Sequence, residues 1–129
     1  MGTWNVDSST PGVLRLTLEG RFTVDEMMAF VTAHNRAIDE YLSSDYKVWC
    51  DISKLLTLGL ECAALFEKAK QYSNLHSNFR GSAVLVSSAV VALQHRRTSL
   101  EGGVMNTELI SQDVGALEQH LRTVYRTSG

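Results

Sequence analysis

The sequence is most informative at Tyr46-Lys47-Val48-Trp49-Cys50-Asp51-Ile52, a run that is apolar nearly throughout. Such a run is typical of a strand covered on both faces of a sheet, and we predict the central strand there. The following residues, 53–59, predict a polar loop with one glycine, and the pattern of 60–72 predicts a helix. In α/β proteins, sites lie beyond the carboxyl ends of strands, where loops meet helix N-termini. We therefore expect the functional surface within residues 51–60.

Length and composition exclude several classes of function. The 129 residues predict one domain spanning 1–129, with the hydrophobic content (44%) and charged content (20%) of a folded globular chain. The net charge of −2 comes from interspersed acidic and basic residues, which argues against nucleic-acid binding and against a polybasic membrane contact. The most apolar segment, 83–93, contains Ser87 and Ser88 and is too short to cross a bilayer. The chain start lacks a signal-peptide pattern, so we expect a cytoplasmic protein without membrane insertion.

The first part of the chain predicts a hairpin followed by a helix. A short strand at 3–7 and an alternating strand at 13–19 flank the turn-forming residues 8–12. Thr23 and Glu26 have the spacing of a capping box, which predicts the start of a helix. The apolar stripe of this helix is expected to contain Met27, Phe30, Val31, Ile38, Tyr41 and Leu42.

Another strand and helix follow the helix at 60–72. A doubly buried strand is predicted at 82–87, and Ser88 is expected to cap a helix that ends at Arg97. Val90 and Leu93 are expected to face inward on this helix. Its last residues are His, Arg and Arg, and basic residues there would complement the negative end of the helix dipole.

The end of the chain predicts one more strand and helix. The strand is predicted at 104–110, and Ser111 is expected to cap the helix. The whole order is β-β-α-β-α-β-α-β-α, which predicts a single-domain α/β fold with a mixed five-stranded sheet and about four helices. The buried stripe of the last helix is expected to contain Val114, Leu117, Leu121, Val124 and Tyr125.

Two local patterns are shared with a known family. One is Gly12-Val13-Leu14-Arg15-Leu16-Thr17-Leu18-Glu19-Gly20-Arg21-Phe22-Thr23, and the other is Trp49-Cys50-Asp51-Ile52-Ser53 followed by Gly59-Leu60. With these patterns, and with its element order and length, the chain resembles the bacterial anti-sigma-factor antagonist (STAS) family in its broad form that includes Sec14-like domains. The first pattern is similar to that family's second strand and first helix entry, and the second to its central strand and switch loop.

The resemblance implies a non-enzymatic regulatory module that binds a protein partner, such as a kinase-like anti-sigma factor. In regulated members, a serine or threonine at the start of the helix after the central strand is phosphorylated. The family's Asp-Ser-Ser before the glycine is replaced here by Leu56-Thr57-Leu58, so we do not expect the usual phosphoswitch. Thr57 is a candidate phosphate acceptor and Ser53 is a second one. We expect Thr57 to serve as the helix N-cap instead.

The partner is expected to dock on the loop and on the exposed face of the following helix. Lys68 and Gln71 are expected on that face. Leu56 and Leu58 stand out because apolar loop residues either insert into the core or form a contact patch. The predicted docking residues are Ser53, Leu56, Thr57, Leu58, Gly59 and Glu61.

No residue pattern nominates an enzyme, a cofactor or a metal site. The histidines lie on different elements without metal-ligand spacing, so each is expected on the surface or in packing, and His34 would be kept neutral if buried. Cys50 and Cys62 are expected to be buried reduced thiols. Asp51 is expected either to be exposed at its strand tip or to accept hydrogen bonds from the loop, including Ser53. The four histidines are His34, His76, His95 and His120.

A second hypothesis is a binder of a small apolar or amphipathic ligand between sheet and helices, as the Sec14-like analogy suggests. Self-association into a homo-oligomer through a sheet edge or a helix face is compatible with both hypotheses. The ligand pocket would be lined by Met27, Met28, Phe30 and Met105.

Overall fold

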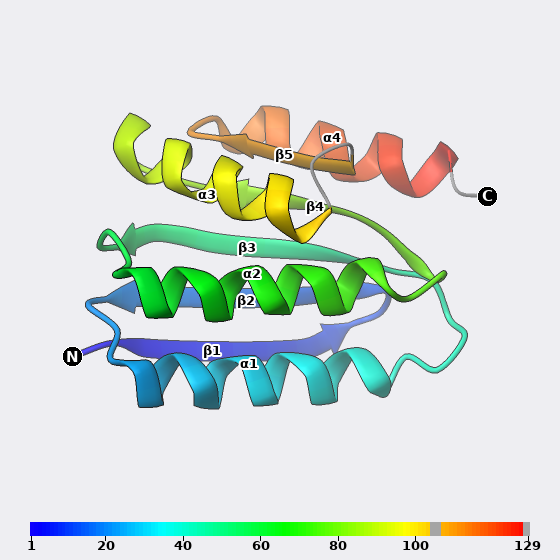
Figure 1. The fold of residues 1–129 in the computed structure, drawn as a ribbon. Coiled ribbons are helices and arrows are strands. Elements are labelled where there is room, and N and C mark those ends of the chain that lie inside the picture. Colours follow the sequence, from blue (N-terminus) through cyan, green and yellow to red (C-terminus); the bar gives the residue numbers. More distant parts are fainter. Residues whose placement is uncertain (104–106, 128–129) are drawn as a thin grey trace.

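The computed structural model describes residues 1–103 and 107–127. The described elements confirm the predicted order and the α/β class (Figure 1). They are β1 (Thr3–Thr10), β2 (Val13–Gly20), α1 (Val24–Asp39), β3 (Tyr46–Leu55), α2 (Leu60–Asn74), β4 (Phe79–Leu85), α3 (Ala89–Gly102), β5 (Glu108–Ser111) and α4 (Val114–Thr127).

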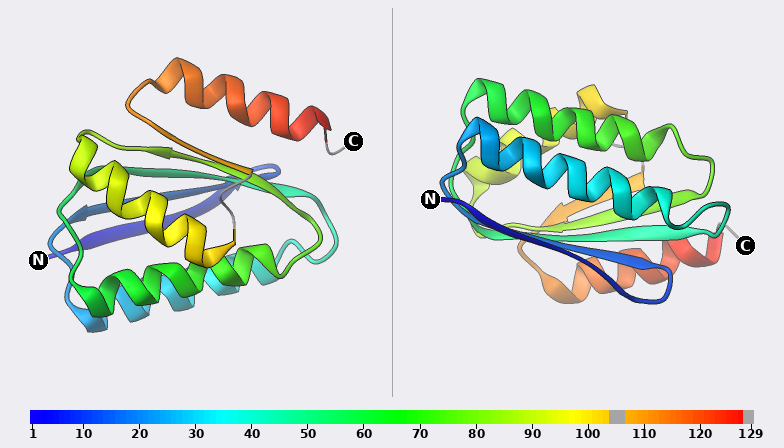
Figure 2. Two further views of the ribbon diagram at one scale, coloured as in Figure 1. Left: turned by 45° about the horizontal axis from the view of Figure 1, so that its top comes forward. Right: turned by 90° about the horizontal axis from the view of Figure 1, so that it is seen from below.

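One mixed sheet runs through the molecule in the order β1-β2-β3-β4-β5. β1 and β2 form the predicted antiparallel hairpin, and each later neighbour is parallel to the one before it. Helices α1, α2 and α3 cover one face, whereas α4 lies alone on the other face (Figure 2). The carboxyl ends of β2 and β3 and the starts of α2 and α3 therefore meet at one edge of the sheet, on the left in Figure 1.

The core is divided between the two faces of the sheet. The larger part lies under α1, α2 and α3 and includes the alternating β2 leucines Leu14, Leu16 and Leu18, as their period of two predicts. A smaller cluster under α4 joins Leu117 and Leu121 to the sheet. Because α4 covers only this part of the reverse face, every second residue of β3 is half-buried, and the expectation that β3 is covered on both faces is met only in part.

The helix starts follow local side-chain chemistry. The predicted capping box is present: Thr23 Oγ1 accepts from the backbone N–H of Glu26 at 3.2 Å, and Glu26 Oε1 accepts from the N–H of Thr23 at 2.8 Å. At α4 the predicted cap was wrong, because Asp113 Oδ1 accepts from the N–H groups of Gly115 and Ala116. Ser111 instead accepts from the N–H of Asp113, within the turn before the helix.

Several predicted boundaries and faces were wrong. Leu42 is not on the buried stripe of α1, because that helix ends at Asp39 and Leu42 is exposed with a left-handed φ of 55°. β4 begins at Phe79 rather than at residue 82 and ends before residue 86. β5 begins at Glu108, and the predicted strand residues 104–106 lie outside the described residues.

On α4, Leu117 and Leu121 are buried as predicted and Val124 is half-buried. Val114 is exposed, because it is the first residue of the helix and precedes the turn that reaches the sheet. The side chain of Tyr125 lies outside the described residues.

Candidate partner-docking surface

The loop after the central strand is shorter than predicted. β3 continues to Leu55, because Lys54 and Leu55 still pair with the end of β2 and the N–H of Leu56 donates to Gly20 O at 3.0 Å. Ser53 is thus a strand residue, and only residues 56–59 connect β3 to α2. A connection of four residues holds the start of α2 close to the end of the sheet.

Asp51 organises the end of β3. Its Oδ1 accepts from the N–H of Ser53 at 2.9 Å and from Ser53 Oγ at 2.6 Å, which confirms the hydrogen-bonded alternative for this carboxylate. Ser87, just beyond β4, donates from its hydroxyl to Ser53 O at 2.6 Å. A phosphate on Ser53 would meet the Asp51 carboxylate as a like charge, so this position is a poor phosphate acceptor.

The two loop leucines separate into a core residue and a surface residue. Leu58 is buried, with 6% of its surface exposed, whereas Leu56 is 49% exposed. Gln94 on α3 fixes Leu58 from both sides, because its Oε1 accepts the Leu58 N–H at 3.0 Å and its Nε2 donates to Leu58 O at 2.8 Å. Gln94 was not among the predicted site residues, because its partner lies 36 positions earlier in the chain and no local pattern connects the two.

Gly59, not Thr57, is the N-cap of α2, so the predicted capping role of Thr57 was wrong. The backbone of Gly59 is extended, with φ −69° and ψ 168°, and no side chain caps the helix. A Cβ at this position would meet no atom within 4 Å. Thr57 is an exposed residue of the loop, two positions before the cap.

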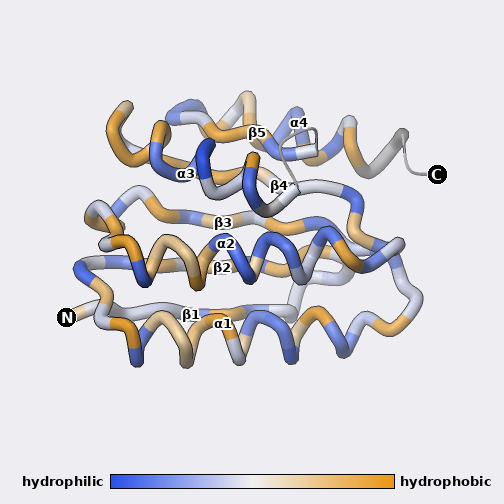
Figure 3. The backbone as a smooth tube through the Cα atoms, viewed as in Figure 1, coloured by the Kyte–Doolittle hydropathy of each residue, from blue (hydrophilic) through white to orange (hydrophobic). Residues whose placement is uncertain are grey.

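An apolar groove runs between α2 and α3, beginning beside this loop. Leu60 is 92% exposed, and Val90 and Leu93 on α3 are each 67% exposed. In Figure 3 the first turns of α3 and the start of α2 are both coloured as hydrophobic. We call this surface the α2–α3 groove; its lining is Leu60, Ala63, Ala64, Glu67, Val90, Leu93, Gln94, Arg97, Thr98 and Glu101.

The buried and exposed faces of helix α3 are the reverse of those predicted. Val90 and Leu93 were predicted to face inward, yet they face solvent, and Leu100 is exposed as well. The helix also continues to Gly102, so the basic residues near position 96 lie in its middle and do not complement its C-terminal end. The side chains that α3 buries are Val91, Ala92, His95, Thr98 and Ser99.

Charges of both signs border the groove. Glu67, Arg97 and Glu101 line its far end, and Glu61, Lys68 and Gln71 on α2 are exposed as predicted. Mixed charge of this kind suits a protein surface better than it suits a nucleic acid or an anionic membrane.

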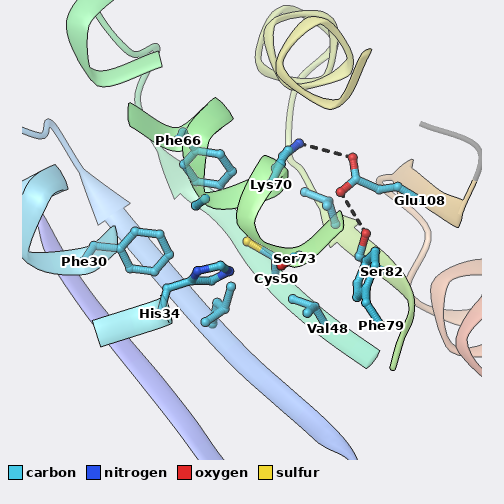
Figure 4. Close-up of a pocket in the computed structure, with 13 residues that line it drawn as sticks. Phe30, His34, Val48, Cys50, Phe66, Lys70, Ser73, Phe79, Ser82 and Glu108 are labelled. Atoms are coloured by element: carbon cyan, nitrogen blue, oxygen red, sulfur yellow. Dashed lines mark hydrogen bonds and ion pairs between the residues drawn. The ribbon is translucent and has the colours of Figure 1, made fainter. Parts of the chain in front are cut away.

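Beneath α3 lies a buried ionic cluster that we call the Lys70 cluster (Figure 4). Lys70 Nζ on α2 lies 3.2 Å from Glu108 Oε1 on β5, and both side chains are less than 10% exposed. The same ammonium donates to His95 O at 3.2 Å and to Ser99 Oγ at 2.5 Å, both on α3. Ser82 Oγ on β4 donates to Glu108 Oε2 at 2.9 Å. Ser99 Oγ is also hydrogen-bonded to Glu108.

The Lys70 cluster was not predicted, although the sequence contains a signal for it. Lys70 lies four positions after Phe66 and directly after Ala69, both of which face the core. Helical periodicity therefore directs Lys70 inward, where a lysine needs a carboxylate partner.

Two histidines are buried and the sequence singled out only one of them. Burial lowers the pKa of His34, which agrees with the expectation that it is neutral. Burial, together with the neighbouring Lys70 ammonium, lowers the pKa of His95 to about 3. Neither ring nitrogen of His95 has a hydrogen-bond partner among the described residues. Its ring packs edge-on against the Phe66 ring, with 4.9 Å between the ring centroids.

The cysteines are buried and free, as predicted. Burial raises the pKa of the Cys50 thiol to about 12, and the Cys62 thiol, whose pKa burial also raises, donates to Phe22 O at 3.6 Å. Both thiols are therefore unreactive at neutral pH. Within residues 1–103 and 107–127, no three His, Cys, Asp or Glu side chains are grouped as metal ligands.

Of the residues predicted to line a ligand pocket, Phe30 borders a small cavity between α2 and the sheet. Met27 and Phe30 are fully buried in the core, Met28 is half-exposed, and Met105 lies outside the described part of the chain. Between α2 and the sheet there is a cavity of about 30 Å³ beside Lys70 and Ser82. That volume has room for about one or two water molecules and is too small for a lipid.

Comparisons with known proteins test the fold. No family model matches the sequence, and no curated protein matches it. Over 92% of its length the chain superimposes on an uncharacterised protein of the DUF3478 family with a SpoIIAA-like fold, from Shewanella loihica PV-4. The match covers 91% of that protein, with a TM-score of 0.63 and 14% sequence identity. The chain has a SpoIIAA-like fold.

This is the fold of the STAS anti-sigma-factor antagonists, so the fold that the local patterns of the sequence suggested is confirmed. At 14% identity the SpoIIAA-like fold carries over and an activity does not. None of the helices in the described ranges has the length and apolar character needed to cross a bilayer.

Proposed function

We propose that this SpoIIAA-like chain is a non-enzymatic regulatory module that docks a partner protein on the α2–α3 groove and the adjoining loop residues 56–59. The observation that carries the proposal is the outward-facing apolar set Leu60, Val90 and Leu93 on two adjacent helices. Burying an exposed leucine or valine side chain contributes about 1.5–3 kcal/mol, so three of them are a substantial source of affinity. The charges at the far end of the groove would set the register of the partner.

The arrangement of polar groups favours binding over catalysis. Ser99 and Lys70 are hydrogen-bonded, a pairing that serves as nucleophile and base in some hydrolases. Ser99 is only 1% exposed and Lys70 is 7% exposed, so a substrate would have no route to either group. The exposed loop, in turn, offers no acid–base pair.

A kinase-like anti-sigma factor is the partner that the family resemblance suggests, and we retain it as the first candidate. Thr57 is the better candidate for phosphorylation, because it is exposed and lies close to the start of α2, where the helix dipole favours negative charge. Ser53 is disfavoured by its hydrogen bond to Asp51.

A groove-dependent capture experiment tests the proposal. The tagged chain is used to recover proteins from the native cell, and each recovered protein is identified by mass spectrometry and then purified and titrated by calorimetry. Leu93→Glu and Leu60→Glu should each weaken that affinity at least tenfold. Leu75→Glu is the matched control, because Leu75 is 80% exposed on the C-terminal end of α2 and lies outside the groove lining.

A partner whose affinity is unchanged by both groove variants would contradict the proposal. Recovery of a bound small molecule in place of a protein would favour the ligand-binding alternative. Phosphate on Thr57 in the recovered chain would identify the regulated residue.

A further inference from the structure

The Lys70 cluster lies directly beneath the α2–α3 groove and joins the elements that form it. Lys70 comes from α2, His95 and Ser99 from α3, Glu108 from β5 and Ser82 from β4. A single ammonium therefore bonds to both α3 and β5 while its own backbone belongs to α2.

Helix α3 depends on these bonds because its inward face is largely polar. α1 buries Met27, Phe30 and Ile38 against the sheet, which is the usual apolar attachment. α3 buries only the small side chains Val91 and Ala92 with its polar set, and its larger aliphatic side chains face solvent. Helix α3 therefore has fewer large apolar anchors than α1, and the hydrogen bonds that Lys70 makes to His95 and Ser99 add to the core contacts of Val91 and Ala92.

The carbonyl of His95 is the point of attachment in the middle of α3. It accepts from Lys70 Nζ at 3.2 Å, from Thr98 Oγ1 at 2.8 Å and from Ser99 Oγ at 2.8 Å. Two groove residues, Gln94 and Thr98, lie on either side of His95 along the helix. A shift of His95 relative to Lys70 would therefore change the width of the groove.

We propose that Lys70 and Glu108 are positioning residues that set the spacing of α2 and α3, and with it the shape of the α2–α3 groove. The importance of this spacing for binding rests on the proposed docking function, but the spacing itself does not. A buried ion pair is a known means of specifying one arrangement of packed elements.

The first test measures the spacing without a partner. Spin labels are attached at Ala64→Cys on α2 and Leu93→Cys on α3, both exposed positions, whereas the native Cys50 and Cys62 are buried. Double electron–electron resonance should give one narrow distribution of the distance between the two spin labels in the parent chain. It should be at least twice as broad, or shifted, in Lys70→Met/Glu108→Gln, a double variant that leaves no unpaired buried charge.

The second test is hydrogen exchange of the α3 amides. In the same double variant we expect α3 to exchange at least tenfold faster relative to α1. Leu117→Ala is the control, because Leu117 is a fully buried residue of α4 on the other face of the sheet, so its loss destabilises the chain without touching α3.

Each outcome is decisive for one of the two proposals. An unchanged distance distribution, or α3 exchange no faster than in the Leu117→Ala control, would overturn the positioning role. The double variant could change the spacing while the groove variants leave the affinity for every partner unchanged. That result would support the positioning role and refute the docking function. A changed spacing together with weakened partner binding supports both.

Discussion

Gln94 holds the backbone of Leu58 on both sides: its amide oxygen accepts the Leu58 N–H at 3.0 Å and its amide nitrogen donates to the Leu58 carbonyl at 2.8 Å. One side chain of α3 thereby satisfies both polar groups of a loop residue whose own side chain is in the core. These two bonds join the loop before α2 to α3.

Gln94→Leu should lower the free energy of unfolding by about 1–3 kcal/mol, because the backbone groups of Leu58 would lose their partners where water reaches them poorly. Urea denaturation of the parent and the variant measures this loss. Gln71→Leu is the control, because the Gln71 side chain is exposed and its bonds are 3.4 and 3.5 Å long. A loss that is equal in the two variants would contradict the special role of Gln94.

Gly59→Asp should stabilise the chain by about 0.5–1 kcal/mol. The φ of Gly59 suits any residue, an added Cβ meets open space, and aspartate is a preferred N-cap that also complements the helix dipole. Thermal unfolding gives the measurement. Gly81→Asp serves as the opposite control, since Gly81 has a φ of +140° and its Cβ would lie 2.6 Å from Thr107 O, so that variant should be destabilised.

Leu58→Ala should cost about 2–5 kcal/mol of stability, as expected when a buried leucine is truncated. Leu56→Ala should change stability by less than about 0.5 kcal/mol, because half of that side chain is in solvent. For partner affinity we expect the opposite ranking of the two substitutions, with Leu56→Ala as the one that weakens binding. Chemical denaturation and calorimetric titration of the same two variants separate the roles, and similar stability losses for both would contradict the assignment.

Stability should fall as the pH decreases below about 6.5. Burial lowers the pKa of His95 to about 3 and also lowers that of His34, so the unfolded chain binds protons more readily than the folded chain over this range. For His95 this stabilisation is complete above about pH 6.5 and is lost progressively as the pH falls toward 3, with a slope of up to about 1.4 kcal/mol per pH unit, and His34 adds a loss in the same direction.

His95→Leu tests this origin of the pH dependence. The ring nitrogens of His95 have no hydrogen-bond partner among the described residues, so an apolar replacement should be tolerated. Urea denaturation at pH 7.5, 6.5 and 5.5 should give a shallower dependence than in the parent. An identical slope would assign the effect to other groups.

Local signals in the sequence predicted those parts of the fold that local chemistry decides. Thr23 and Glu26 form the capping box that their spacing indicates, and β2 alternates because its leucines do. The bonds from Ser53 to Asp51 join residues two positions apart, and they were one of the two alternatives that the sequence left open for this carboxylate. The shared patterns extended this local information to the whole fold.

The candidate site was predicted less well, because long-range contacts decide it. Val90 and Leu93 follow an apolar pattern that normally faces a core, and the inward side of α3 is taken by hydrogen bonds to Lys70, a residue of another helix. Thr57 has the chemistry of an N-cap, but the pairing of Lys54 and Leu55 with β2 extends the strand and places Gly59 at the helix start. Neither effect is visible in a window of neighbouring residues.

The position of α4, alone on the reverse face of the sheet, has a practical consequence (Figure 2). A chain anchored to a sensor surface through a linker after α4 would present the opposite side, with α2 and α3, to the solution. Anchoring through the first residues is less suitable, because Gly2 packs closely against the Phe22 ring and its N–H donates to Glu26. Immobilisation at the α4 end is therefore the arrangement in which surface-based affinity measurements leave the leucine-lined side unobstructed.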